Sequence, residues 1–194
     1  MQNLKQTESR LPVVFDTKLE DIPGGVTVAS SDLVQKVVKA GTPVGKDENG
    51  LYHVVKVAKL QADAADDATA YRVLKGHNFK VGNVITAKES GKAYAITAID
   101  TSNADYDQFT VGTTLGIALT VASGSVLMEA SAVAATDISV LKYQPAGLIG
   151  TTYDVVESQN HLVDCVVRGS VREAVIDPIG ATVKAKVQPL IRFV

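Results

Sequence analysis

The apolar residues of this chain come in short runs of Val, Ile, Thr and Ala that are separated by glycine-containing turns. The turn over residues 47–50 ends in Asn49 and Gly50, a pair that supplies the positive φ angles of a tight hairpin turn. Residues 88–91 form a second turn of this kind between two apolar runs. β-Branched residues favour strands, so the spacing predicts a mainly β fold of short strands joined by tight turns.

Individual elements follow from the same pattern. Asp177 is a suitable helix N-cap and Pro178 suits the first helical position, so one short C-terminal helix is expected to run to Val187 and to end before Pro189. Residues 100–108 are polar and are expected to form a loop. Strands are expected over residues 33–38, 51–57, 71–74, 79–86, 92–99, 113–121, 125–129 and 161–175.

The two ends of the chain differ in character. Residues 1–30 contain few apolar residues and are predicted to form an extended N-terminal arm, which packs on a neighbouring molecule or lies along its own domain. Residues 190–194 are apolar and predict a final strand. A terminus this apolar is expected to be docked, either in its own fold or across a subunit boundary.

Composition excludes several classes of protein. The 194 residues are 46% hydrophobic and 21% charged, with a net charge of −2, which argues against a disordered chain and against a basic nucleic-acid binder. The apolar runs are too short for a membrane span, and the polar start predicts no secretory signal. The single cysteine, Cys165, excludes an internal disulfide and a multi-thiolate zinc site.

Residues that could carry chemistry are sparse. His161 and Cys165 are four apart on an expected strand, about 13 Å, which is too far for one metal ion. The acidic residues Asp63, Asp66 and Asp67 lack the alternating ligands of a calcium loop and are expected to be solvated. Neither a Gly-x-Ser-x-Gly elbow nor a phosphate-binding loop is present. The expectation is therefore a protein without catalytic residues, cofactor or metal.

Several segments resemble the head fiber and head decoration proteins of tailed phages, including phages of gut bacteria. The clearest are Gly-Thr-x-x-Gly-Lys over residues 41–46 and Val-Arg-Gly-x-Val over residues 167–171. The likeness covers most of residues 31–194. It extends to residues 71–82, 105–107, 146–150, 166–174 and 190–194. In such proteins a short link joins the two halves, whereas about 80 residues separate them here.

The resemblance implies a decoration-like β core over residues 31–65 and 143–194, with an inserted β-hairpin subdomain over 66–142. It also implies a structural accessory protein on the capsid exterior, made in the host cytoplasm. The expected partners are further copies of the chain, as a homotrimer, and the major capsid protein, with no nucleic acid and no membrane. The candidate contact residues are apolar and lie in the arm and the tail: Val13, Val14, Phe15, Leu190, Ile191, Phe193 and Val194.

Two other hypotheses remain open. The inserted subdomain could bind a host-surface glycan, with Tyr71, Tyr94 and Tyr106 as stacking residues, which would make the protein a carbohydrate-binding surface module. Ordinary packing is the alternative role for these tyrosines. A hydrolase whose carboxylates are assembled in space is the third hypothesis, although the lack of Trp argues against a sugar-cleaving cleft.

Overall fold

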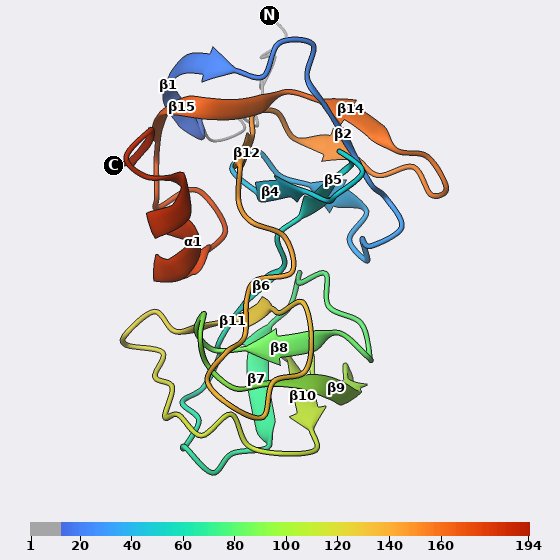
Figure 1. Ribbon diagram of the computed structural model, residues 1–194, viewed down its shortest axis with the longest axis vertical. Coiled ribbons are helices and arrows are strands. Elements are labelled where there is room, and N and C mark those ends of the chain that lie inside the picture. The colour runs from blue at the N-terminus through green and yellow to red at the C-terminus, as the bar shows by residue number, and fades with distance from the viewer. Residues whose placement is uncertain (1–12) are drawn as a thin grey trace, which may run out of the picture.

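A computed structural model describes residues 13–194 and shows a mainly β protein with two lobes along its long axis (Figure 1). Its one described helix, α1 (Gly180–Val187), lies near the C-terminus, as the sequence predicted. Short strands and tight turns make up the rest. The described glycines with positive φ include Gly50, at the Asn-Gly turn that the sequence identified.

We call the lobe that holds both described chain ends the proximal lobe. It is built on an eight-stranded sheet. Across the sheet the order is β1 (Phe15–Asp21), β15 (Cys165–Val171), β12 (Gly147–Ile149), β4 (Pro43–Lys46), β5 (Tyr52–Val54), β2 (Val26–Val28) and β14 (His161–Val163), while β16 (Ile191–Phe193) also pairs with β15. A two-stranded sheet of β3 (Val37–Val38) and β13 (Tyr153–Asp154) lies beside it.

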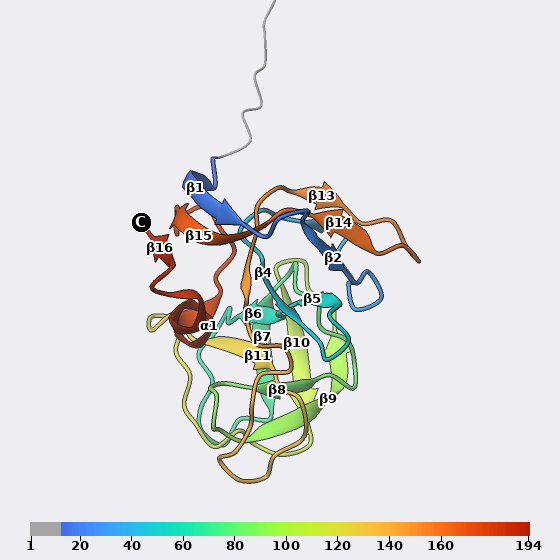
Figure 2. The same cartoon turned by 45° about the horizontal axis from the view of Figure 1, so that its top comes forward.

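The inserted lobe is a curled six-stranded sheet whose strands all lie between β5 and β12 in the chain. Their order is β6 (Val57–Lys59), β11 (Val126–Glu129), β8 (Val84–Thr86), β9 (Ala93–Asp100), β10 (Tyr106–Val111) and β7 (Ala70–Leu74). Leu60 and Val73 form a bridge between the ends of the first and last strands, so the sheet curls around its own core (Figure 2). It begins at Val57, before the expected boundary at residue 66.

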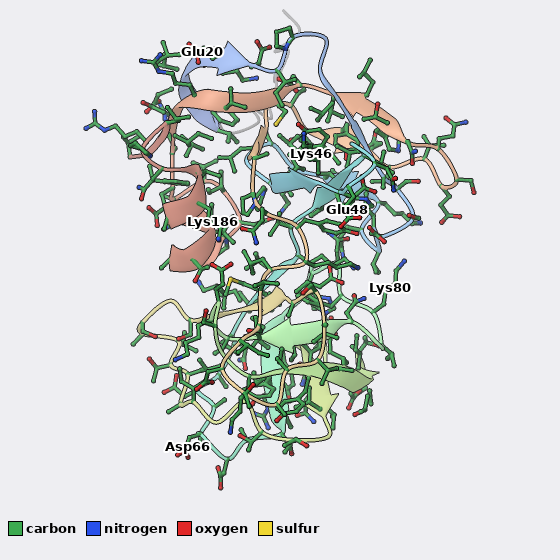
Figure 3. All side chains as sticks on the ribbon, viewed as in Figure 1. Glu20, Lys46, Glu48, Asp66, Lys80 and Lys186 are labelled. Carbon is green, nitrogen blue, oxygen red and sulfur yellow. The ribbon has the colours of Figure 1, made fainter. Side chains whose placement is uncertain are left out.

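Each lobe has its own apolar core, and a third cluster joins them. Tyr71, Phe79 and Phe109 fill the inserted lobe, and Val28, Val44 and Ile149 lie under the proximal sheet. The joining cluster packs helix residues Val183 and Val187 against residues of β11, Val126 and Met128. The helix therefore covers the seam where the two lobes meet. Lys186 of α1, which is labelled in Figure 3, forms an ion pair of 2.8 Å with Glu89 of the inserted lobe.

The extended arm expected over residues 1–30 is not separate from the fold where it is described. Residues 1–12 of that arm lie outside the described residues. β1 pairs antiparallel with β15, and β2 lies between β5 and β14 with Val26 and Val28 buried. These residues therefore lie along their own domain, the alternative that the sequence left open.

Other elements differ from those predicted because of contacts with distant parts of the chain. Residues 113–121 form no strand, only a bridge from Leu119 to Ala64. The polar stretch 100–108 includes the start of β10, because Asp107 pairs with Lys75 and His77. The expected strand over 161–175 divides at Asp164, where the chain changes from pairing with β2 to pairing with β12.

Candidate interaction surface

Both described ends of the chain lie against the same strand. β1 runs along one side of β15, and β16 runs along the other, so that Val171 is opposite both Phe15 and Phe193. Beyond this point the N–H of Arg172 donates to the carbonyl of Val14, and the N–H of Glu173 donates to the carbonyl of Val194, each at 2.8 Å. The structure therefore brings the arm and the tail residues together at the end of β15.

The seven candidate contact residues predicted from the sequence, in the arm and the tail, differ in how far their side chains are exposed to a partner. Ile191 is 1% exposed and belongs to the core, so its predicted contact role is wrong. Val14, Phe15 and Phe193 are half-buried and pack against the cluster that joins the lobes. The other three have half or more of their surface exposed, and we call them the terminal patch: Val13 at 56%, Leu190 at 58% and Val194 at 50%.

Two charged pairs lie next to the chain ends that carry the terminal patch. Arg172 Nε lies 2.5 Å from Asp16 Oδ1, and Lys184 pairs with Glu173. Such exposed pairs contribute little to stability, about 0–1 kcal/mol each, but they can set the orientation of a partner. Sequence reasoning did not select Arg172 and Glu173, although both belong to the segment that carries the phage resemblance.

Among residues 13–194, free strand edges belong to the proximal sheet and to the small sheet of β3 and β13, since the sheet of the inserted lobe curls until its ends meet. β1 forms one edge and is exposed along most of its length. Its pairing with β15 shifts register at three points, including between Phe15 and Thr17. Bulges of this kind hinder the addition of another strand, so side chains at the end of β15 are better placed for contact than the edge backbone.

The three tyrosines proposed to stack on a glycan do not form a common platform. Tyr71 is fully buried, and its hydroxyl donates to the Ala68 carbonyl at 2.8 Å, so its proposed role in stacking is wrong. Tyr94 is half-buried against the core of the inserted lobe. Tyr106 is half-buried and has the Arg72 guanidinium 5.1 Å from its ring centre, which leaves it the better placed of the two.

Two cavities add little to the glycan hypothesis. One, of about 150 Å³, lies between the lobes and is lined by residues such as Val55, Lys59 and His77. That volume is below the roughly 300–1,000 Å³ of ordinary ligand pockets. The other, of about 640 Å³, is bounded by residues 30–36 and 155–160, and its lining includes no aromatic side chain for stacking.

A buried histidine joins three segments of the proximal lobe. His53 on β5 has Nδ1 2.5 Å from Asp32 and Nε2 3.5 Å from Asp47, and its ring stacks on Tyr143 at 4.2 Å. Burial alone would raise the pKa of Asp32, but the hydrogen bond to His53 and the charge of Lys56 hold it below its ordinary value. The cluster holds the segment around Tyr143, which leads from the inserted lobe back to the proximal lobe, against the sheet. We assign this cluster a structural role.

The remaining chemical candidates are buried or dispersed. Burial raises the pKa of the Cys165 thiol to about 12, with a smaller contribution from the charge of Asp164, so this thiol is unreactive at neutral pH. Within residues 13–194, His, Cys, Asp and Glu side chains form no group of three that could hold a metal ion. In the same range no helix has the length and apolar character needed to cross a bilayer.

Comparison of the chain with protein-family models, with curated proteins and with solved structures finds no match. The terminal patch is therefore interpreted from its own geometry.

Proposed function

We propose that this chain is a structural accessory protein of a phage capsid, which binds the outer surface of the major capsid lattice as a head fiber or decoration protein. The observation that carries the proposal is the convergence of both described chain ends on β15, with Val13 exposed on one side of that strand and Leu190 and Val194 exposed on the other. A contact protein needs such an apolar area at a defined place in its fold.

The energetics of the patch fit an assembly role. Burying a fully exposed Val or Leu side chain contributes about 1.5–3 kcal/mol. These three residues are already about half-buried, so each would add about half of that value, repeated at every equivalent contact of an assembly. We propose a homotrimer, in which each copy presents one face to the next around a closed axis. Its place is the virion exterior, after synthesis in the host cytoplasm.

The phage assignment rests on the sequence resemblance, and the positions of its motifs support it. The Gly-Thr-x-x-Gly-Lys segment ends in β4, and the Val-Arg-Gly-x-Val segment forms most of β15. β12 lies between these two strands in the sheet. The resembling segments therefore build the centre of the proximal lobe, and one of them is the strand against which both described chain ends pack.

Substitution of the exposed leucine of the patch tests the proposal. Leu190→Glu should lower the molecular mass measured by light scattering to that of a monomer, and should abolish co-sedimentation with capsids, because a charge would have to be buried in the contact. The matched control is Leu162→Glu on β14, at the opposite edge of the same sheet, where Leu162 is 72% exposed. It should leave both measurements unchanged.

Two results would contradict the proposal. One is a wild-type protein that remains monomeric at tens of micromolar and does not bind capsids. The other is equal loss of assembly in both leucine variants, which would show that the effect is not specific to the patch. The alternative function, a carbohydrate-binding surface module, is favoured only by the partial exposure of Tyr106 and would require hits on a glycan array that Tyr106→Ala removes.

A further inference from the structure

Three side chains with complementary chemistry meet at the upper end of the inserted lobe. Lys56 directly precedes β6, Asn83 directly precedes β8, and Glu129 ends β11, which lies between those two strands. The N–H of Glu129 donates to the Lys56 carbonyl at 3.2 Å, which sets the two residues side by side. Lys56 Nζ lies 3.0 Å from Asn83 Oδ1 and 3.4 Å from Glu129 Oε1.

Burial makes this arrangement unusual. The side chains of Lys56 and Glu129 are 2% and 3% exposed, and Asn83 is half-buried. Glu129 Oε2 has no hydrogen-bond partner among the described residues. A buried ion pair is a costly way to stabilise a fold, because two charges lose their hydration. The arrangement is better explained if the lysine amine reacts after the protein has folded and thereby loses its charge.

We propose that Lys56 Nζ condenses with the side-chain amide of Asn83 to form an intramolecular isopeptide bond, with release of ammonia and with Glu129 carrying the protons. The reaction is an acyl transfer in which a lysine amine replaces the amide nitrogen of asparagine. It requires no oxidant, metal or cofactor.

The nucleophile is prepared by its surroundings. Burial lowers the pKa of Lys56, and the neighbouring charge of Glu129 only partly opposes this effect. A desolvated lysine is more readily converted to the neutral amine, which is the nucleophilic form. Nζ lies 3.0 Å from Oδ1, so the amine is held beside the amide, and a rotation of the Asn83 side chain would present the carbonyl carbon to it.

The steps balance in atoms and charge. Lys56 Nζ transfers a proton to Glu129, and its lone pair attacks Cγ of Asn83 to form a tetrahedral centre. Nδ2 of Asn83 takes the proton held by Glu129, the Cγ–Nδ2 bond breaks, and ammonia leaves. The second Nζ proton passes through Glu129 to the departing ammonia, so the products are a neutral secondary amide and one ammonium ion.

Two neighbouring groups, a backbone N–H and a second lysine, would assist the reaction. The backbone N–H of Lys80 donates to Asn83 Oδ1 at 2.9 Å, and it can stabilise the negative charge that develops on this oxygen during attack. Lys142 Nζ lies 3.1 Å from Glu129 Oε1 and holds the carboxylate in place. Because Lys56 Nζ contacts Oε1 at 3.4 Å, this oxygen is the one that receives the proton.

Mass spectrometry of the purified full chain tests the proposal. The intact mass should be lower than the sequence mass by one ammonia molecule, and a protease digest should contain a branched peptide that joins Lys56 to Asn83. Lys56→Met, Asn83→Ala and Glu129→Gln should each have the full mass expected for their sequence. Asn83→Asp should instead lose one water molecule, because the leaving group changes.

A competing source of ammonia loss must be separated from this one. Asn49 and Gly50 form an exposed Asn-Gly turn, and succinimide formation there would give the same change in intact mass. A full-length wild-type mass would overturn the proposal. So would a loss of ammonia that maps to residues 49–50, or one that persists in Lys56→Met. The wild-type peptide map decides the question even if a variant fails to fold.

Discussion

His77 is a buried residue whose hydrogen bonds define its protonation state. Its Nδ1 accepts from the backbone N–H of Phe79 at 3.2 Å and therefore carries no proton, while Nε2 lies 3.1 Å from Asp107. Burial lowers the pKa of His77, and the carboxylate of Asp107 only partly opposes this. The ion-pair distance to Asp107 would suggest a charged ring, but the accepting Nδ1 identifies the neutral form.

This gives a pH-dependent stability with a defined sign. Because the pKa of His77 is lower in the folded state, the unfolded chain binds more protons as pH falls below the ordinary value of 6.5. We expect the free energy of unfolding, measured with urea, to fall between about pH 6.5 and the lowered folded pKa. His77→Gln should reduce this slope and His161→Gln, in the other lobe, should retain it. Equal slopes in wild type and His77→Gln would contradict the assignment.

At the scale of the element, β16 shows how a chain end can be both docked and exposed. Ile191 is 1% exposed in the joining cluster, whereas its neighbour Leu190 is 58% exposed. Alternation along the strand places one residue in the core and the next on the surface. The tail therefore docks in its own fold and still supplies part of the terminal patch.

Truncation of the inward residue should measure how firmly β16 is held. Ile191→Ala should lower the free energy of unfolding by about 2–5 kcal/mol, the range for buried isoleucine. Ile138→Ala is the matched control, because Ile138 is 71% exposed on a loop of the inserted lobe, and it should change stability by less than about 0.5 kcal/mol. Similar losses in both variants, measured by urea unfolding, would show that β16 does not depend on this contact.

At the scale of the whole molecule, the two lobes share a core through α1 and β11. Gly180 begins α1 with a φ of +72°, and a side chain there would overlap Val126 of the inserted lobe. Close approach of the helix to β11 therefore requires glycine at this position. Since residues of both lobes form one cluster, we expect a single unfolding transition by calorimetry.

Substitution of this glycine should loosen the seam. Gly180→Ala should cost at least the ~1–3 kcal/mol of an unfavourable backbone conformation, with an additional cost from the overlap with Val126. Gly124→Ala is the control, since Gly124 has a φ of +66° but open space around it. The control should show the backbone cost alone. Equal changes in Tm for the two variants would mean that the contact with Val126 is unimportant.

The sequence predicted some helices and strands more accurately than others. The C-terminal helix was predicted because Pro189 marks its end, but its start was not: Asp177 pairs with Lys39 at 3.0 Å, and the helix begins at Gly180. β9 was predicted closely because its flanking turns are local signals. β10 was missed because its polar residues are stabilised by partners on distant parts of the inserted lobe, among them Lys75 for Asp107.

The candidate surface shows the same limit. Apolar character alone selected all seven arm and tail residues, and it could not separate buried Ile191 from exposed Leu190. Lys56, Asn83 and Glu129 gave no signal at all, since they are far apart in the chain and none belongs to a recognised motif. Their proximity results from the order of three strands in the curled sheet.

Local physics in the sequence therefore determined that the chain forms short strands, where many turns fall, and that its apolar end must be covered. These properties depend on backbone preferences and on neighbours within a few residues. Only the tertiary structure decided that both described chain ends meet on one strand, which tail residues face solvent, and that a lysine, an asparagine and a glutamate share a buried site. Each of these depends on strand order and register, which are set by packing between residues distant in the chain.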